Sequence, residues 1–219
     1  MLLTRYGLRE WMIITLAAAA TAAAGVFFGH GWMAIAALAV WAALVSFFRD
    51  PLGRRPATAD PRDFVSPADG LVSAVVSVPE HPATGGPATI VRIYLSVLDV
   101  HVNRSPCACE VLDLVHTPGK YLDVRIPESA QVNESLLMRL RTEGGVAIGV
   151  KQIAGKVART IVNPLKAGAR LGRGERFGMI KFGSTTELIV PTAEVEAVRV
   201  STGTRVTGGV TVLVRMKRA

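Results

Sequence analysis

The pattern of hydrophobic and polar positions divides the chain into an apolar start and a longer segment of short apolar runs. Residues 11–28 and 32–48 are two uncharged, alanine-rich runs separated by a Gly-His-Gly turn. Each run is near the lower length limit for a helix that crosses a membrane, about 17–25 residues. Their small side chains allow two helices to approach closely. The pattern therefore predicts a membrane-associated helical hairpin over residues 1–48.

Arginines flank this hairpin on both sides. Arg5 and Arg9 precede it, and four more follow it: Arg49, Arg54, Arg55 and Arg62. Because positive flanks stay on the cytoplasmic side, we expect the folded domain at the cytoplasmic face of the cell membrane. Two alternatives are shallow insertion into one leaflet and a cleaved signal peptide. A signal peptide leaves the second apolar run unexplained.

From residue 64 onward, short runs rich in valine and isoleucine alternate with glycine and proline. The predicted strands are residues 71–78, 89–96, 107–116, 135–142, 146–153, 157–162, 176–182, 187–190, 195–200 and 210–215. Their spacing of about ten residues predicts a mainly β, antiparallel sandwich or barrel-like catalytic domain over residues 64–219. A short helical piece is expected within residues 122–130. Residues 49–63 contain three prolines and predict an extended, exposed linker.

The net charge of the chain bears on which kind of partner it binds. The 219 residues carry a formal net charge of +8, which suits nucleic acid or anionic lipid. Aromatic residues are few and no nucleic-acid-binding motif is present, so the apolar start favours anionic membrane lipid and no nucleic acid. The basic side chains expected to face lipid are Lys151, Lys156, Arg159, Lys166, Arg170, Arg173 and Arg176.

The cysteine content bears on the compartment. Cys107 and Cys109 are two residues apart, so both point to the same face of a strand and are too close for an ordinary structural disulfide. A metal site needs more ligands than this pair supplies. Buried, reduced thiols are the expected state, which is typical of a cytoplasmic domain.

The chemistry centres on Gly183 and Ser184, at the end of the predicted strand 176–182. A serine hydroxyl can attack the preceding carbonyl carbon and turn the amide into an ester, and glycine leaves that carbonyl open. β-Elimination and hydrolysis then convert the serine into a pyruvoyl group, a ketone that can act as an electron sink. A Gly-Ser pair after a strand is usually only a turn, so the case depends on the rest of the chain.

Three further motifs precede this pair. They are residues 66–70 (SPADG), 99–106 (DVHVNRSP) and 116–120 (HTPGK). Taken alone, Asp69 fits a capped β-turn, and a lone histidine such as His101 is more often structural than catalytic.

Together, and behind an apolar hairpin, these motifs and residues 151–162 (KQIAGKVARTIV) resemble the phosphatidylserine decarboxylase family. The similarity is greatest to its short bacterial and archaeal branch and covers nearly all of residues 46–191. It implies a self-cleaving proenzyme with a mostly β catalytic domain. It also implies a pyruvoyl group that forms a Schiff base with phosphatidylserine, releases CO2 and yields phosphatidylethanolamine. No metal and no pyridoxal phosphate are implied.

The resemblance also implies the site residues. A relay similar to that of serine proteases falls on Asp69, His101 and Ser184. Cleavage between Gly183 and Ser184 gives a β-chain, 1–183, and an α-chain, 184–219, that stay together as a heterodimer, with a higher oligomer as a further option.

Two departures from the family pattern bear on these roles. Arg104 stands where the long branch has a second histidine, so His101 serves alone or shares its duties. Residues 133–135 are Asn-Glu-Ser where the family often has Asn-Glu-Arg, which puts the role of a basic residue there in doubt.

Three other functions are compatible with parts of this pattern. An archaetidylserine decarboxylase has the same head-group chemistry. A non-enzymatic membrane adaptor with a lipoyl-like β-domain also carries Asp-Gly before valine-rich strands, but predicts an intact chain. A soluble pyruvoyl-dependent amino-acid decarboxylase has no use for the hairpin.

Overall fold

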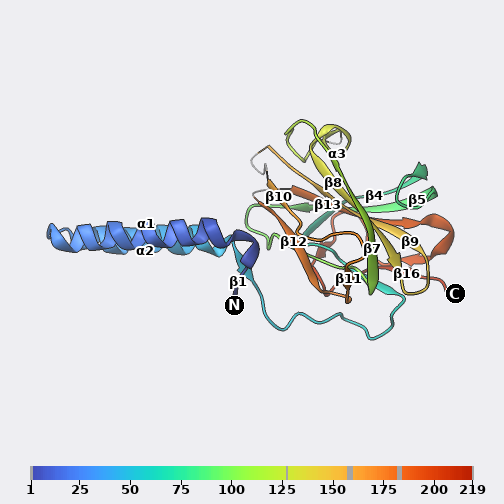
Figure 1. Cartoon of the computed structure of the whole chain (residues 1–219), viewed down its shortest axis with the longest axis horizontal. Helices are drawn as coiled ribbons and strands as arrows, with labels where there is room; N and C mark the ends of the chain where they lie inside the picture. The colour runs from blue at the N-terminus through green and yellow to red at the C-terminus, as the bar shows by residue number, and fades with distance from the viewer. Residues whose placement is uncertain (1, 127, 157–159, 182–183, 219) are drawn as a thin grey trace. The chain divides into compact units, whose positions relative to one another are not determined.

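A computed structural model describes every residue of the chain except 1, 127, 157–159, 182, 183 and 219. The chain forms two compact units, residues 1–52 and 53–219. The first is helical, and the second consists mainly of β-strands (Figure 1).

The first unit is an antiparallel helical hairpin, as the two apolar runs predict. Alanine favours helix, and α1 (Leu8–Phe27) and α2 (Gly31–Ser46) lie side by side in opposite directions (Figure 1). A Cβ added at Gly25 would lie 2.6 Å from the Cβ of Met33, so glycine lets the helices meet there. Three short elements accompany the helices: η1 (Arg5–Gly7), and the paired strands β1 (Leu2–Leu3) and β2 (Arg49–Asp50).

The surface of this hairpin suggests association with a membrane. The helical stretch Arg5–Phe27 is long and apolar enough to cross a bilayer, and Gly31–Ser46 is apolar but shorter. Large apolar side chains such as Leu16, Phe27 and Ile35 are exposed. A hairpin whose outer face is apolar is poorly matched to water and well matched to lipid.

Three antiparallel sheets make up the described part of the second unit. The eight-stranded sheet has the order β11 (Arg170–Leu171), β7 (Cys109–Thr117), β8 (Ser135–Thr142), β9 (Ala147–Ile153), β13 (Ser184–Pro191), β5 (Gly86–Leu95), β4 (Gly70–His81) and β15 (Arg205–Val206). One three-stranded sheet has the order β10 (Thr160–Val162), β12 (Arg176–Lys181) and β6 (Val102–Arg104). The other has the order β14 (Val195–Val198), β16 (Val212–Met216) and β3 (Asp63–Val65). Two short helices, α3 (Ser129–Val132) and η2 (Thr192–Glu194), connect strands.

The core combines side chains of the large sheet with side chains of the two small sheets. Ile93, Val150 and Leu188 of the large sheet belong to one buried cluster with Phe177 of β12 and Leu213 of β16. The sheets are not closed into a barrel. Of the two predicted forms of the mainly β fold, sandwich and barrel, the structure therefore fits the sandwich of packed sheets.

Most predicted strands are present, with bounds that shift by a few residues. β8 has the predicted bounds, residues 135–142. β13 begins at Ser184, three residues earlier than predicted. Residues 157–159 and 182, which the predicted strands included, lie outside the described residues. The predicted helical piece is the four-residue α3, near the end of its expected range.

The segment before β3 is bound to the β unit rather than fully exposed, which corrects the prediction for the linker. The amide of Ala57 donates to the carbonyl of Val210 at 3.0 Å. The guanidinium of Arg173 donates to the carbonyl of Thr58 at 2.8 Å. Because this segment has no regular secondary structure, its backbone amides and carbonyls are available for these long-range bonds.

Candidate active site

The proposed cleavage site lies where the chain leaves one sheet and enters another. β12 belongs to a three-stranded sheet, and β13, which starts at Ser184, lies between β9 and β5 in the eight-stranded sheet. Ser184 pairs with Leu95 at the end of β5. Gly183, its predicted partner in the cleavage, lies outside the described residues.

The Ser184 hydroxyl is buried and unsatisfied. Its side chain is fully buried, and Oγ has no hydrogen-bond partner among the described residues. Leaving a buried hydroxyl without a partner costs about 1–3 kcal/mol, so such groups are rare and often functional. This orphaned oxygen fits a side chain that is consumed in a reaction.

His101 lies beside the end of β12, the strand that precedes Ser184 in the sequence. The residue is fully buried, and its carbonyl accepts a hydrogen bond from the amide of Ile180, near the end of β12. Its ring Nδ1 is 2.9 Å from the carbonyl oxygen of Asp99. Because a carbonyl oxygen can only accept, Nδ1 carries the hydrogen, and Nε2 is the basic nitrogen of the neutral ring. The backbone thus selects the tautomer that a general base needs.

Asp69 is held by other groups than the relay implies. Its carboxylate forms a two-pronged ion pair with Arg54, with Nη2 to Oδ2 at 2.7 Å. Oδ1 also accepts from the amide of Gly208 at 2.8 Å. These are the partners of Asp69 among the described residues, and His101 is not one of them. The relay of Asp69 and His101 therefore remains a prediction, and Arg54 is a partner that the sequence did not reveal.

Asn103 connects the three segments that carry the predicted site residues. Its Nδ2 donates to the Thr186 hydroxyl at 3.1 Å and to the carbonyl of Pro67 at 3.3 Å. Its Oδ1 accepts from Nε2 of Gln152 at 2.8 Å. Asn103 follows His101, Pro67 precedes Asp69, and Thr186 follows Ser184, so one buried amide ties these segments together. Sequence analysis missed this role, because nothing in the motif marks its asparagine as buried.

The HTPGK motif has a structural explanation. Nε2 of His116 lies 3.0 Å from Oε1 of Glu134, and the other carboxylate oxygen, Oε2, accepts from the Tyr121 hydroxyl. The hydrogen bonds from Tyr121 and then from His116 hold the pKa of Glu134 below its usual value. A Cβ at Gly119 would lie 2.5 Å from the backbone of Asn133. The motif therefore packs directly against the Asn-Glu-Ser segment.

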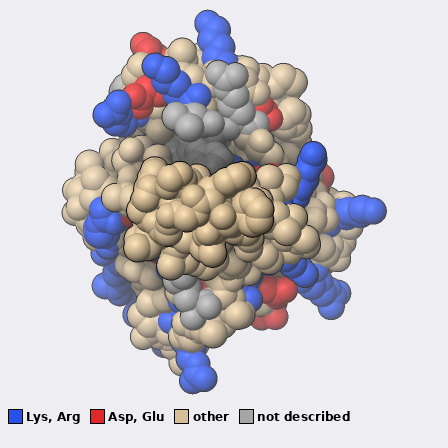
Figure 2. Space-filling model, turned by 90° about the vertical axis from the view of Figure 1, so that its left-hand side faces the viewer, with Lys and Arg blue, Asp and Glu red and all other residues tan. Residues whose placement is uncertain are grey.

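Two of the predicted lipid-facing cations are used inside the β unit. The Lys151 ammonium donates to the carbonyl of Ala130 at 2.9 Å, and burial lowers its pKa. Arg173 donates to backbone carbonyls of the segment before β3. Arg159 lies outside the described residues. The exposed members of the set are Lys156, Lys166, Arg170 and Arg176, and lysine and arginine side chains project from the β unit around the rim of Figure 2.

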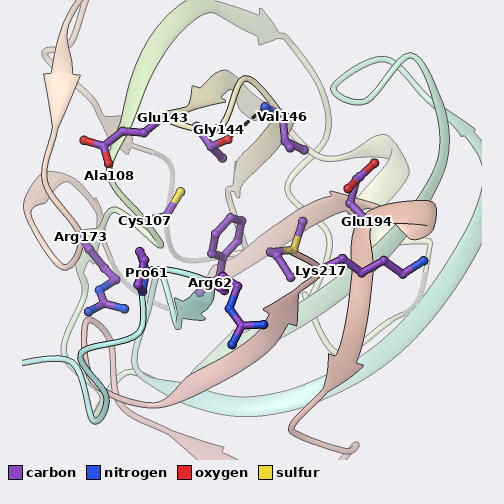
Figure 3. A pocket seen from close by; sticks show the side chains of 13 residues that line it. Pro61, Arg62, Cys107, Ala108, Glu143, Gly144, Val146, Arg173, Glu194 and Lys217 are labelled. Atoms are coloured by element: carbon purple, nitrogen blue, oxygen red, sulfur yellow. Dashed lines mark hydrogen bonds between the residues drawn. The ribbon is translucent and has the colours of Figure 1, made fainter. Parts of the chain in front are cut away.

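The two cysteines are free and buried, as predicted. Cys107 points into a cavity of about 490 Å³ that Phe64, Val146 and Met216 also line (Figure 3). None of the described residues that line this cavity is Ser184, His101 or Asp69. The cavity is therefore distinct from the candidate site residues.

Comparison with known proteins agrees with the motifs. Residues 41–214 match the family model described as phosphatidylserine decarboxylase. A phosphatidylserine decarboxylase proenzyme of Symbiobacterium thermophilum is 46% identical over 170 residues, 78% of this chain and 77% of the relative. Proteins of the same name from Carboxydothermus hydrogenoformans and Pelobacter propionicus are 37% and 41% identical, over 94% and 85% of this chain and 94% and 82% of their own lengths.

These matches, to which the mainly antiparallel β fold adds no conflict, show the class of protein: the chain is a decarboxylase, a lyase of phospholipid metabolism. It belongs to the phosphatidylserine decarboxylase family. The match extends over most of the β unit, which favours the enzyme over the lipoyl-like adaptor.

Proposed function

We propose that the chain cuts itself between Gly183 and Ser184 and becomes a pyruvoyl-dependent phosphatidylserine decarboxylase at the membrane. The observation that carries this proposal is the buried Ser184 hydroxyl, which has no hydrogen-bond partner among the described residues. The word proenzyme in the names of the relatives also fits a chain that matures by cleavage.

The cleavage uses groups of this chain. Nε2 of His101 takes the Ser184 hydroxyl proton while Oγ bonds to the carbonyl carbon of Gly183. The amide C–N bond breaks, the Ser184 nitrogen gains a proton, and an ester joins the two residues. Loss of the Ser184 α-proton then expels the ester oxygen, which frees residues 1–183 with a carboxylate end. Water hydrolyses the dehydroalanine left at position 184 to a ketone and ammonia.

The strand order supports the proposal that the two chains would stay together after cleavage. The α-chain, residues 184–219, would contribute β13 between β9 and β5 of the large sheet. It would also contribute β16, whose Leu213 is fully buried in the core. Separating the chains would break two ladders of backbone hydrogen bonds and expose this core.

A pyruvoyl group at position 184 supplies a ketone that binds the substrate amine covalently and accepts the electron pair left by departing CO2. The chain's own part is to bury this position, exclude water and return a proton, a task we assign to His101. The fully buried surroundings of Ser184 and His101 suit this task, because a dry site strengthens electrostatic interactions. The head group alone does not separate the archaeal lipid, so assays with both tail chemistries decide that alternative.

A carbonyl reagent tests the proposed cofactor. Phenylhydrazine condenses with ketones to a hydrazone and releases water, so brief treatment is expected to abolish release of CO2 from phosphatidylserine vesicles. It should also raise the mass of the chain that begins at residue 184 by one phenylhydrazine less one water. An equal dose on a Ser184→Ala variant is the control and should add no mass. Full activity after complete reagent exposure would contradict a pyruvoyl mechanism.

We also propose that the hairpin holds the enzyme at the cytoplasmic leaflet. The exposed apolar side chains of α1 and α2 and the arginines on both flanks support this. A reporter that is active only in the periplasm, fused after residue 219, is expected to stay inactive, whereas a cytoplasmic reporter should be active. Activity of the periplasmic fusion would reject this side of the membrane and revive the signal-peptide alternative.

A further inference from the structure

We propose that the turn formed by residues 96–99 is a preformed apolar tip that enters the lipid surface beside the active site. This inference rests on the proposed function, because it concerns how a membrane substrate reaches Ser184. The tip is defined by the side chains of Val97 and Leu98.

The turn is fixed at both ends. The amide of Asp99 donates to the carbonyl of Ser96 at 2.9 Å, which closes a β-turn. The amide and hydroxyl of Ser96 both donate to Oδ2 of Asp99, at 2.8 and 2.7 Å. Arg205 donates to Oδ1 of the same carboxylate at 2.8 Å. A rigid turn loses little conformational entropy on binding.

The two central residues of this turn are apolar and exposed. The exposed fraction is 51% for Val97 and 82% for Leu98, the highest among the large apolar residues in the described part of the β unit. Glycine, proline, asparagine and aspartate are the usual residues at such positions. Two adjacent apolar side chains on a fixed tip are therefore unexpected for a turn that faces only water.

The tip is directly connected to the candidate active site. Leu95, just before the turn, pairs with Ser184. Asp99, at the end of the turn, accepts through its carbonyl oxygen the hydrogen bond of Nδ1 of His101. Because Ser184 and His101 are both buried, a lipid must enter from a neighbouring surface. If the tip enters the bilayer here, the active site lies close to the membrane surface. The lipid head group then has a shorter distance to move out of the membrane to reach Ser184.

Charge near the tip points to apolar contact as the main interaction. Arg205 is exposed but forms an ion pair with Asp99. Arg125 is within electrostatic reach of Tyr94 in β5, but it forms an ion pair with Asp123. Burial works to raise the pKa of Asp99, yet the hydrogen bonds from Ser96 and the Arg205 pair outweigh it, so the pKa is lowered and the pair is charged at neutral pH. Paired cations attract anionic lipid weakly, so insertion should depend little on salt.

A fluorescent label at the tip tests this contact directly. Leu98→Cys in the full chain is labelled with nitrobenzoxadiazole, and the unsubstituted chain treated in the same way gives the contribution of the buried Cys107 and Cys109. With vesicles of phosphatidylcholine and phosphatidylserine that carry spin labels on their acyl chains, we expect a blue shift and quenching. Both effects should persist at high salt. Val76→Cys is the matched control: it is an exposed apolar site, 38% exposed, on β4 away from the tip. Its label should not be quenched.

The outcomes separate this inference from the proposed function. Quenching needs no cleavage, so a protein that fails to cut itself still reports whether the tip meets lipid. An unquenched label at position 98 in a protein that cuts itself and binds vesicles would overturn the inference and leave the decarboxylase intact. A blue shift without lipid that grows with protein concentration would assign the tip to a second copy of the chain, and would also overturn it.

Activity provides a second readout. For Leu98→Asp, the ratio of kcat/KM on phosphatidylserine vesicles to kcat/KM on a monomeric short-chain phosphatidylserine should fall by roughly ten-fold, the scale of one lost leucine contact. Val76→Asp should leave this ratio near the wild-type value. An unchanged ratio in Leu98→Asp would contradict a role of the tip in reaching the membrane substrate.

Discussion

Ser184→Ala is expected to leave the 219-residue chain uncut and without decarboxylase activity. Alanine lacks the oxygen that attacks the carbonyl of Gly183, and it also lacks the leaving group from which the ketone forms. The effect is a complete loss, because no neighbouring group replaces both functions. A denaturing gel shows the uncut chain, and release of labelled CO2 from the substrate carboxyl measures the activity.

Thr185→Ala is the matched control for this change. Thr185 is buried on the same strand and carries a hydroxyl one residue further along. This variant should still separate into two chains, since its hydroxyl is not adjacent to the carbonyl that is attacked. Cleavage that persists in Ser184→Ala, or that stops equally in Thr185→Ala, would contradict the assignment of the nucleophile.

His101→Ala is expected to slow self-cleavage by about 10²–10⁴-fold, the typical contribution of a general base. Cleavage over hours or days, rather than none, is the expected result, because this variant keeps Ser184 as the nucleophile and loses only the base that activates it. A time course on a denaturing gel measures the rate. The pyruvoyl enzyme that accumulates then reports whether His101 also acts in decarboxylation.

Variants of Asp69 and Arg54 test the rest of the relay. If the relay is correct, Asp69→Ala should slow self-cleavage less than His101→Ala does, because an aspartate orients the histidine without taking its proton. Arg54→Ala removes the observed partner of Asp69 and frees the carboxylate to approach His101, so cleavage should proceed close to the wild-type rate. Equal slowing in both variants would mean that Asp69 acts through its ion pair with Arg54. Normal cleavage in both His101→Ala and Asp69→Ala would break the relay and leave Ser184 as the cleavage site.

The strands that alternate between buried and exposed positions could be predicted from sequence. β8 has the predicted bounds because Met138 and Leu140 alternate with less buried residues. The start of β13 could not be predicted in the same way. Ser184, Thr185 and Glu187 are polar and predict exposure, yet all three are buried in the middle of the large sheet. The Glu187 carboxylate is compensated by Arg92 at 2.7 Å, a partner 95 residues away.

The candidate site, like the fold, could be predicted from the sequence only in part. The motifs indicated Ser184 and His101, and the structure places Ser184 at the start of β13 and the backbone of His101 against Ile180 near the end of β12. The hydrogen-bond partners could not be predicted, because they come from distant parts of the chain. Arg54 lies in a segment that composition predicts to be exposed, but it pairs with Asp69. Asn103 meets Gln152 and Thr186 only through sheet pairing and packing.

The most direct test of self-cleavage at Ser184 is the intact mass of the purified, active protein under denaturing conditions. We expect two chains, 1–183 with an ordinary carboxyl end and 184–219 with a blocked amino end. The smaller chain should be lighter, by one ammonia, than its sequence with an amino-terminal serine. A single full-length mass from active protein, or a smaller chain that retains its amino-terminal serine, would contradict the account.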